Sequence, residues 1–347
     1  KKVKAAVWKG PYKLSLEEMS VPEPGRGEVL IKTKAVGICE TDIEIYSGRF
    51  PQSVPPMVMG HEGGGTIEEL GPDVTGFEIG ERVMAECIIY CGECYFCKRG
   101  TPWLCDNVMI KGVEGEGTQG EYADYFTAPA RNCHRLPETI SWREAGLIDT
   151  LACPVHAIHK IEMPLAATVA VFGPGPAGLF FTRMAKLRGA RQVILVGTRE
   201  NRLQLGKQYG ADETINIHDA DPAAVILELT GGRGVDLVIE ASGNERAFND
   251  GLKTVRKGGQ FLIYGVFGGG PISTDIQNIQ RCEFTIIGAA GADYTTAIDL
   301  VARGEIALKP LVTHTFSLEE LPEAFSSGLI AERKDNYIKG TVLFTEE

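Results

Sequence analysis

Four of the nine cysteines in this 347-residue chain lie close together. They follow the spacing C-x2-C-x2-C-x7-C, at Cys91, Cys94, Cys97 and Cys105. Four thiolates complete a tetrahedral shell around Zn²⁺ and leave no position open for water, which is typical of a structural site. The spacing therefore predicts a structural zinc ion in a lobe of about residues 87–110. The alternatives are a disulfide framework and four reduced cysteines that are neighbours by chance.

Composition favours metal over disulfides and limits the classes of partner. The formal net charge is −11, whereas nucleic acids and anionic membranes attract basic surfaces. The first residues, KKVKAAVWKG, lack the apolar core of a secretory signal, and no uncharged apolar run reaches the ~18 residues of a bilayer span. We therefore expect a cytoplasmic protein with reduced thiols and small-molecule partners, which binds neither nucleic acid nor membrane.

The pattern of elements changes near residue 150 and predicts an α/β fold of two parts. Up to that point, Gly and Pro separate short alternating runs such as 28–36, which are typical of half-buried antiparallel strands. From residue 168, apolar strands alternate with helices, which indicates a doubly wound parallel sheet. Near the end, helical segments at 295–305 and 320–334 precede a strand at 339–346, and these could return to the first part.

A glycine-rich turn lies at the end of the first predicted strand of the parallel sheet, TVAVFG at 168–173. It fits G-x-G-x-x-G and consists of Gly173, Pro174, Gly175, Pro176, Ala177 and Gly178. Glycine at the first and third positions allows a tight turn and close approach of a pyrophosphate to backbone N–H groups, and the helix that follows favours the anion. Between a strand and a helix, this motif predicts a dinucleotide site; the alternative is a plain turn.

The end of the second parallel strand bears on the choice of cofactor. NAD sites usually carry an acidic residue there for the ribose hydroxyls, but this chain has Gly197. Thr198 can donate a hydrogen bond, Arg199 offers a guanidinium fork to a phosphate, and Arg202 follows one turn later. The pattern favours NADP over NAD. The alternative is that both arginines belong to the solvated start of a helix.

Several segments together resemble the zinc-dependent medium-chain alcohol and polyol dehydrogenases, of the sorbitol and threonine dehydrogenase type. They are GICETD at 37–42, GHEGGGTI at 60–67, the four-cysteine lobe, GPGPAG and PEAF at 322–325, and the resemblance covers essentially the whole chain.

The resemblance implies an architecture for each part of the chain. A GroES-like β-barrel catalytic domain is expected at 1–154 and 291–347, and a Rossmann NAD(P)-binding domain at 155–290. Members of this family are commonly homodimers or homotetramers, and the apolar stretches FLIYGVFGG and FTIIGAAG are plausible places for the sheet to continue across a two-fold axis.

The resemblance also implies a second zinc ion, which is catalytic. Its ligands in the family correspond to Cys39 and His61 here, and the implied third ligand is Asp149. Cys153 is a competitor for that place, because simple alcohol dehydrogenases use a cysteine in this region. Glu62 is expected to support the histidine or to act as an alternative fourth ligand.

Four other residues near these motifs need an interpretation. Thr41 matches the family's hydroxyl relay for the alcohol proton. Glu40 departs from the family pattern, which usually has glycine there. His156 and His159 have the i, i+3 spacing of a helical metal pair, but a core or surface role near the domain hinge is favoured.

These residues together predict a zinc-dependent NAD(P) oxidoreductase with one catalytic and one structural zinc ion per chain. An alcohol held at the open zinc position loses its proton and passes a hydride to the nicotinamide. The substrate is expected to be a secondary alcohol, either a polyol or a sugar-derived alcohol, and the product its ketone. The alternatives are threonine 3-dehydrogenation, a simple secondary alcohol, and a zinc-ribbon nucleotide-sensing protein without catalysis. A zinc-free quinone reductase is disfavoured, since it would have no use for the ligands.

Overall fold

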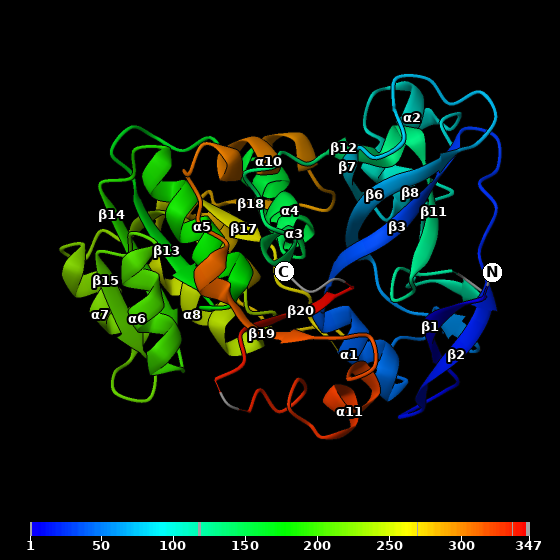
Figure 1. The fold of residues 1–347 in the computed structure, drawn as a ribbon. Helices are drawn as coiled ribbons and strands as arrows, with labels where there is room; N and C mark the ends of the chain where they lie inside the picture. Colours follow the sequence, from blue (N-terminus) through cyan, green and yellow to red (C-terminus); the bar gives the residue numbers. More distant parts are fainter. Residues whose placement is uncertain (1, 117–118, 269, 335, 345–347) are drawn as a thin grey trace. The chain divides into compact units, whose positions relative to one another are not determined.

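The computed structural model describes residues 2–116, 119–268, 270–334 and 336–344 (Figure 1). The chain divides into two compact units, Lys1–Ala152 with Tyr294–Glu347, and Cys153–Asp293. The segment after residue 293 therefore returns to the first unit. Helix α4 (Ile148–Ile158) begins in the first unit and ends in the second. Within the described ranges, no helix combines the length and the apolar character that crossing a membrane requires.

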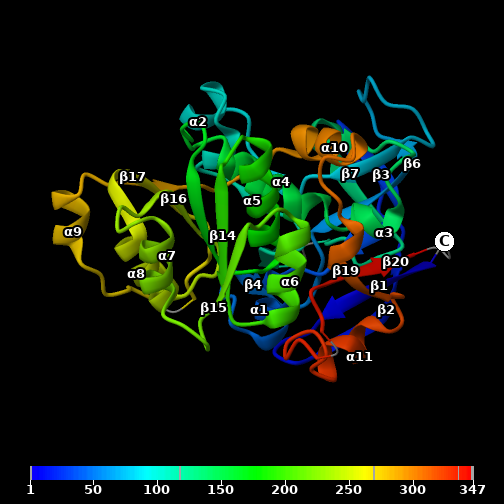
Figure 2. The same cartoon turned by 90° about the vertical axis from the view of Figure 1, so that its left-hand side faces the viewer.

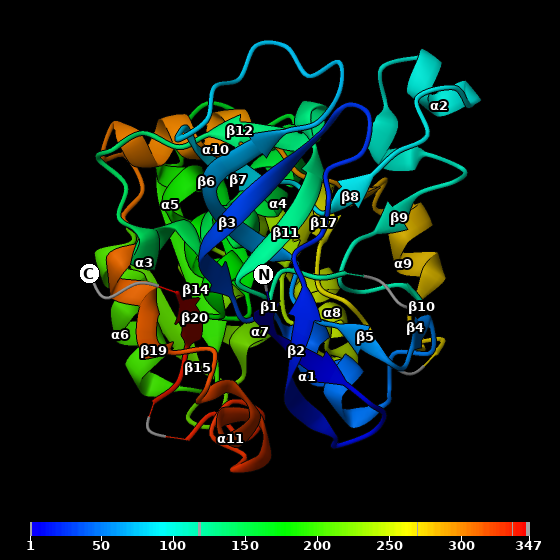
Figure 3. The same cartoon turned by 45° about the vertical axis from the view of Figure 1, so that its right-hand side comes forward.

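The first unit is built on a seven-stranded sheet with the order β12-β7-β6-β3-β20-β19, in which β11 also pairs with β3 (Figure 3). Its strands are β3 (Glu28–Gly37), β6 (Glu62–Leu70), β7 (Arg82–Ala85), β11 (Tyr125–Pro129), β12 (Cys133–Arg135), β19 (Val312–Phe316) and β20 (Lys339–Leu343). All pairs are antiparallel except β19 with β20. The strand predicted at 28–36 is confirmed as β3.

Smaller elements complete this unit. Strands β2 (Leu14–Ser20), β1 (Lys2–Trp8) and β5 (Met57–Val58) form one sheet, β10 (Gly115–Glu116) pairs with β4 (Ser53–Val54), and β8 (Ile88–Ile89) pairs with β9 (Met109–Ile110). The helices are α1 (Glu40–Ser47), α2 (Tyr95–Lys98), α3 (Trp142–Ala145), α10 (Tyr294–Ala302), α11 (Leu321–Ser326) and the 3-10 turns Pro102–Leu104, Ala130–Asn132 and Lys309–Leu311. Helix α2 and the first of these turns lie between β8 and β9 and form the cysteine lobe.

The second unit confirms the predicted doubly wound parallel sheet. Its strand order is β15-β14-β13-β16-β17-β18, and all pairs are parallel. The strands are β13 (Thr168–Phe172), β14 (Gln192–Gly197), β15 (Glu213–Asn216), β16 (Val235–Glu240), β17 (Val255–Ile263) and β18 (Thr285–Gly288). The helices are α5 (Pro176–Leu187), α6 (Glu200–Gln208), α7 (Pro222–Leu229), α8 (Glu245–Thr254) and α9 (Ile276–Arg281). Every residue of β13 is buried, as expected for a central strand with helices on both faces of the sheet (Figure 2).

The helix predicted at 320–334 is shorter than expected. Helix α11 ends at Ser326, and Gly328 adopts a φ of 76°, in the left-handed region that ends helices. The residues after it form turns as far as Arg333. The prediction was therefore wrong over its second half, because the helix-forming residues after Gly328 do not overcome the stop signal at this glycine.

Candidate metal and cofactor sites

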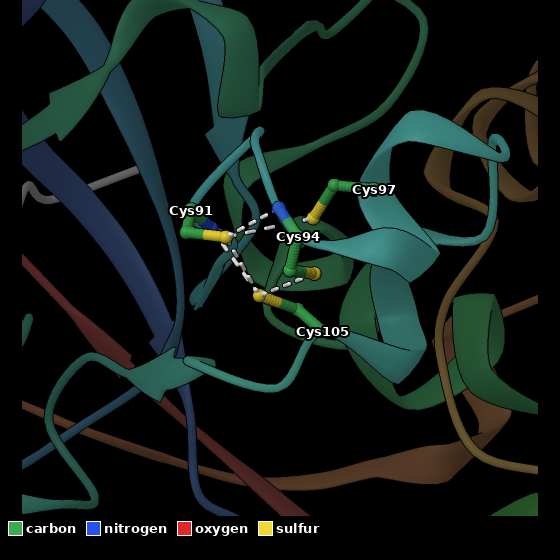
Figure 4. A group of neighbouring side chains, drawn as sticks. All are labelled: Cys91, Cys94, Cys97 and Cys105. Carbon is green, nitrogen blue, oxygen red and sulfur yellow. Dashed lines mark hydrogen bonds between the residues drawn. The ribbon is translucent and has the colours of Figure 1, made fainter.

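The four cysteines of the lobe point toward one another (Figure 4). Their Sγ atoms lie within 4.8 Å of each other, with 3.5 Å between Cys91 and Cys105 and 3.8 Å between Cys94 and Cys105. Cys94 is the N-cap of α2, which carries Cys97. None of the nine cysteines, all of which lie in the described ranges, forms a disulfide.

Backbone N–H groups donate hydrogen bonds to several of these sulfurs, although burial raises the pKa of Cys97 to about 12. The N–H of Cys94 donates to Cys91 Sγ, and the N–H groups of Cys91 and Asn107 donate to Cys105 Sγ, each at 3.3 Å. Backbone hydrogen bonds also lower the pKa of Cys91, and they lower that of Cys94 to about 6. Four converging sulfurs with such support fit a tetrahedral zinc ion.

A second group of potential metal ligands consists of Cys39, His61 and Glu62. Their ligand atoms also lie within 4.8 Å of one another. Strand pairing places them together: Cys39 follows the end of β3, His61 and Glu62 stand at the start of β6, and Gly37 is directly opposite Glu62 in the antiparallel pair. One thiol, one imidazole and one carboxylate form a donor set that suits Zn²⁺.

Asp42 orients His61. Its Oδ1 lies 3.4 Å from His61 Nδ1, while its Oδ2 accepts hydrogen bonds from the Cys39 N–H and the Tyr122 hydroxyl, both at 2.8 Å. Burial opposes a charge on His61, but Asp42 and Cys39 outweigh it and raise the pKa of His61 well above its usual value. Because Asp42 faces Nδ1, Nε2 is the ring nitrogen that would bind a metal.

Glu62 is paired with a buried cation. Lys339 Nζ, on β20, lies 2.5 Å from Glu62 Oε2, and both side chains are almost fully buried. Burial opposes the charge on Lys339, but Glu62 raises the pKa of Lys339 above its usual value. The Thr150 hydroxyl also donates to Glu62, at 3.2 Å. The ion pair and this hydrogen bond hold the carboxylate beside Cys39 and His61.

Asp149 lies outside this group of three but in the same buried polar region. Its carboxylate accepts a hydrogen bond from the Tyr294 hydroxyl on α10. Burial and the nearby charge of Glu62 raise the pKa of Asp149 to about 6, whereas His61 lowers it. The ring of Tyr294 is stacked on His134, with centroids 4.8 Å apart. The hydrogen bond that holds the Asp149 carboxylate thus comes from Tyr294, a residue 145 positions away in the sequence.

The other predicted residues are placed as follows. The Thr41 hydroxyl lies 3.6 Å from Cys39 Sγ. Glu40 forms an exposed ion pair with Arg333 at 2.8 Å. Cys153 lies on α4, one turn after Asp149, and is half-buried. His156 and His159 belong to no group of metal ligands among the residues that the structure describes.

The glycine-rich turn joins β13 to α5 as predicted. Gly173 has a φ of 105°, and a Cβ on Gly178 would lie 1.8 Å from the carbonyl oxygen of Gly173, so both positions need glycine. A Cβ on Gly175, the N-cap of α5, would meet no atom within 4 Å. That space lies directly at the helix N-terminus, where an anion is favoured. Pro176, at the first helical position, and Ala177 complete the turn.

At the end of β14, Gly197 is buried and Thr198 is exposed. Arg199 is the half-buried N-cap of α6. Arg202 is only 7% exposed, so it does not belong to a solvated helix face. Arg199 and Thr198 are the residues of this group that a ligand can reach.

Several residues around the group of Cys39, His61 and Glu62 were not predicted from the sequence. They are Asp42, Tyr122, Lys339, Tyr294 and Glu121. Asp42 follows Cys39 closely, and its place in the GICETD segment was an available signal. Glu121 is fully buried, and burial raises its pKa to about 8 against the influence of His61 and Lys111. No local pattern marks the last four, because they reach the site from distant parts of the chain: Lys339 lies on β20, Tyr294 on α10, and Glu121 and Tyr122 in the segment before β11.

Known proteins that resemble this chain in sequence and fold are dehydrogenases. The family model for the alcohol dehydrogenase GroES-like domain matches residues 25–138, and that for zinc-binding dehydrogenase matches residues 176–303. D-arabitol-phosphate dehydrogenase of Enterococcus avium is 36% identical over 322 residues, which cover 91% of each chain. L-threonine 3-dehydrogenase of Bacillus subtilis is 37% identical over 333 residues, 93% of this chain and 94% of that one. A solved structure from Sinorhizobium meliloti, assigned as a zinc-binding dehydrogenase and bound to NADP, has a TM-score of 0.92, 28% identity and 99% coverage of both chains.

Proposed function

We propose that this chain, which belongs to the zinc-dependent medium-chain alcohol and polyol dehydrogenase family, oxidises a polyol or sugar-derived secondary alcohol to its ketone with NADP. Membership in the family confirms the expected oxidoreductase activity on small-molecule alcohols and removes the nucleotide-sensing alternative. The observation that carries the proposal is the group of half-buried Cys39 with buried His61 and Glu62, whose ligand atoms converge.

We assign two zinc ions to each chain, one to the four-cysteine lobe and one to Cys39 and His61 with a carboxylate. Asp149 is the proposed third ligand, and Glu62, whose carboxylate oxygen lies within 4.8 Å of the ligand atoms of Cys39 and His61, is the alternative. A zinc ion with an open position lowers the pKa of a bound alcohol. Thr41, beside Cys39, would accept the alcohol proton and pass it on. Asp42 would hold His61 in the tautomer that leaves Nε2 free, and Lys339 would compensate the charge of Glu62.

For the cofactor, the glycine-rich turn and the N-terminus of α5 would bind the pyrophosphate. Thr198 and Arg199 would bind the 2′-phosphate of NADP, with Arg202 supporting the turn from its buried position. The absence of an acidic side chain at Gly197 supports NADP over NAD. The solved structure from Sinorhizobium meliloti binds NADP and is similar over nearly the whole chain.

A second candidate is oxidation of the hydroxyl group of L-threonine. The threonine dehydrogenase of Bacillus subtilis is as similar to this chain as the arabitol-phosphate enzyme. Both substrates are small polar secondary alcohols, so the same ligands and the same proton relay would serve either one.

We also propose a homodimer or homotetramer that works in the cytoplasm. Strand β18 is the last strand in its sheet, and Ile286 on it is 36% exposed. An edge strand with apolar side chains can pair with the same strand of a second copy. A reducing compartment would keep the zinc-binding thiols available.

Metal content and substrate oxidation together test the proposal. Zinc per chain is counted by mass spectrometry in the wild type, in Cys39→Ser and in Cys97→Ser. The reduction of NADP and NAD is then followed with a panel of polyols, L-threonine and simple secondary alcohols. We expect two zinc ions in the wild type, and one zinc ion, a retained fold and no activity in Cys39→Ser. A single zinc ion that survives Cys39→Ser and is lost in Cys97→Ser would refute the catalytic zinc site.

A further inference from the structure

The glycine-rich turn fills the space that a side chain at the end of β14 would need. An ideal Cβ on Gly197 would lie 2.3 Å from Cγ and 2.4 Å from Cδ of Pro174. Such distances are far below van der Waals contact, and a proline ring has no rotamer that would move these atoms away. Both residues are buried, so neither side of the contact can relax into solvent.

The turn that carries Pro174 is held on both sides. The N–H of Gly173 donates to the carbonyl of Val196 at 2.9 Å, which ties the turn to the residue before Gly197. On the other side, Gly178 approaches so closely that its Cβ would lie 1.8 Å from the oxygen of Gly173. The carbonyl of Gly197 is also fixed, since it accepts the N–H of Ile217 at 3.0 Å. Any side chain at position 197 must therefore displace the turn that would bind the pyrophosphate.

We propose that Pro174 and Gly197 form a specificity-determining pair, in which the proline ring excludes any side chain from the position where an acidic residue would bind the ribose hydroxyls of NAD. The inference rests on the proposed binding of NADP and adds a cause to it. Because position 197 must stay without a side chain, recognition of this end of the cofactor falls to Thr198 and Arg199. Cofactor specificity at the end of β14 is thus set by Pro174, which lies in the glycine-rich turn after β13.

The steric half of the proposal is tested without nucleotide. Thermal unfolding of the zinc-loaded protein is measured for Gly197→Ala, Pro174→Ala and the double variant. Gly288→Ala is the matched control, because Gly288 also ends a strand of this sheet and its Cβ would meet no atom within 4 Å. We expect Gly197→Ala to lower Tm by about 2–10 °C, the double variant to recover most of that loss, and the control to change little. An unchanged Tm in Gly197→Ala, or the same loss in the Pro174→Ala background, would overturn the proposal.

The specificity half is tested by calorimetric binding of NAD and NADP to the zinc-loaded protein. We expect Gly197→Asp alone to bind NAD no more tightly than the wild type does. Pro174→Ala/Gly197→Asp should bind NAD about tenfold or more tightly than Gly197→Asp, with weakened NADP binding. Equal NAD affinity in the single and double variants would overturn the pair. A wild type that prefers NAD would instead refute the NADP assignment, while the Tm series still decides whether Pro174 excludes a side chain.

Discussion

Replacing Tyr294 with phenylalanine removes one hydroxyl group beside Asp149 and leaves the aromatic ring in place. The Tyr294 hydroxyl donates to the Asp149 carboxylate, and both residues are buried. The stacking of the ring on His134 does not involve this hydroxyl and should persist. Tyr294→Phe therefore tests whether Asp149 must be held in place to serve as a zinc ligand.

The expected magnitude can be worked out in two ways. A hydrogen bond to a charged group contributes about 1.5–3 kcal/mol. Loss of a hydrogen-bonding partner of a metal ligand typically weakens metal binding ~10–100-fold, which corresponds to about 1.4–2.8 kcal/mol. The two ranges agree. We therefore expect Tyr294→Phe to weaken the zinc site of Cys39 and His61 by one to two orders of magnitude.

The assay is competition of the zinc-loaded protein with a chelator, with zinc counted by mass spectrometry at each chelator concentration. The zinc of the four-cysteine lobe is the internal reference, since it should dissociate as in the wild type. Tyr46→Phe is the matched control, because Tyr46 is buried and its hydroxyl donates to the Tyr12 carbonyl at 3.4 Å. If Tyr294→Phe folds and retains both zinc ions with wild-type affinity, Asp149 is not a ligand that Tyr294 holds.

Three further perturbations test the surroundings of the two sites. Lys339→Met leaves the buried Glu62 carboxylate without its cation, so the free energy of unfolding, measured by urea denaturation, should fall by about 3–5 kcal/mol. The loss should be smaller in Lys339→Met/Glu62→Gln, which removes the carboxylate charge as well. Equal losses in the two variants would contradict the ion-pair argument. Arg199→Ala should weaken NADP binding by about 1.5–3 kcal/mol in calorimetry and leave NAD binding nearly unchanged, whereas an equal loss for both cofactors would speak against phosphate recognition. Asp236 accepts a hydrogen bond from Arg256 at 2.6 Å; burial opposes its ionisation, but Arg256 and a backbone N–H lower its pKa below the usual value. This stabilisation is present above the unfolded-state pKa of about 4 and is lost as the pH falls through the lower folded-state pKa. The difference in unfolding free energy between the wild type and Asp236→Asn, about 2 kcal/mol at pH 7, should therefore shrink toward pH 3, and a constant difference would show that the charge is not its source.

The fold class and the family were predictable because they depend on local patterns. Alternation of strands and helices after residue 168 is visible in the sequence, and the parallel sheet confirms it. The four cysteines lie within one lobe, so their spacing alone predicted that they bind the same metal ion. Their sulfurs converge in the structure. The predicted length of the helix at 320–334 was wrong, because these residues favour a helix on average while a single glycine, Gly328, ends it.

The group around His61 depends on tertiary structure. Cys39 and His61 are brought together by the register of β3 and β6, Lys339 arrives on β20, and Tyr294 arrives on α10. The clash that would follow a side chain at Gly197 is likewise invisible in the sequence, because Pro174 reaches it from a different turn.

The amino-acid sequence by itself determined the fold class, the dehydrogenase family and the residue types available for chemistry. The tertiary structure decided which carboxylate lies beside Cys39 and His61, which cation compensates it, and why position 197 has no side chain. The physical reason is the sequence separation of the residues that interact. Secondary structure and closely spaced ligands follow from neighbouring residues, whereas burial, charge compensation and steric exclusion depend on atoms that are distant in the chain and adjacent only after folding.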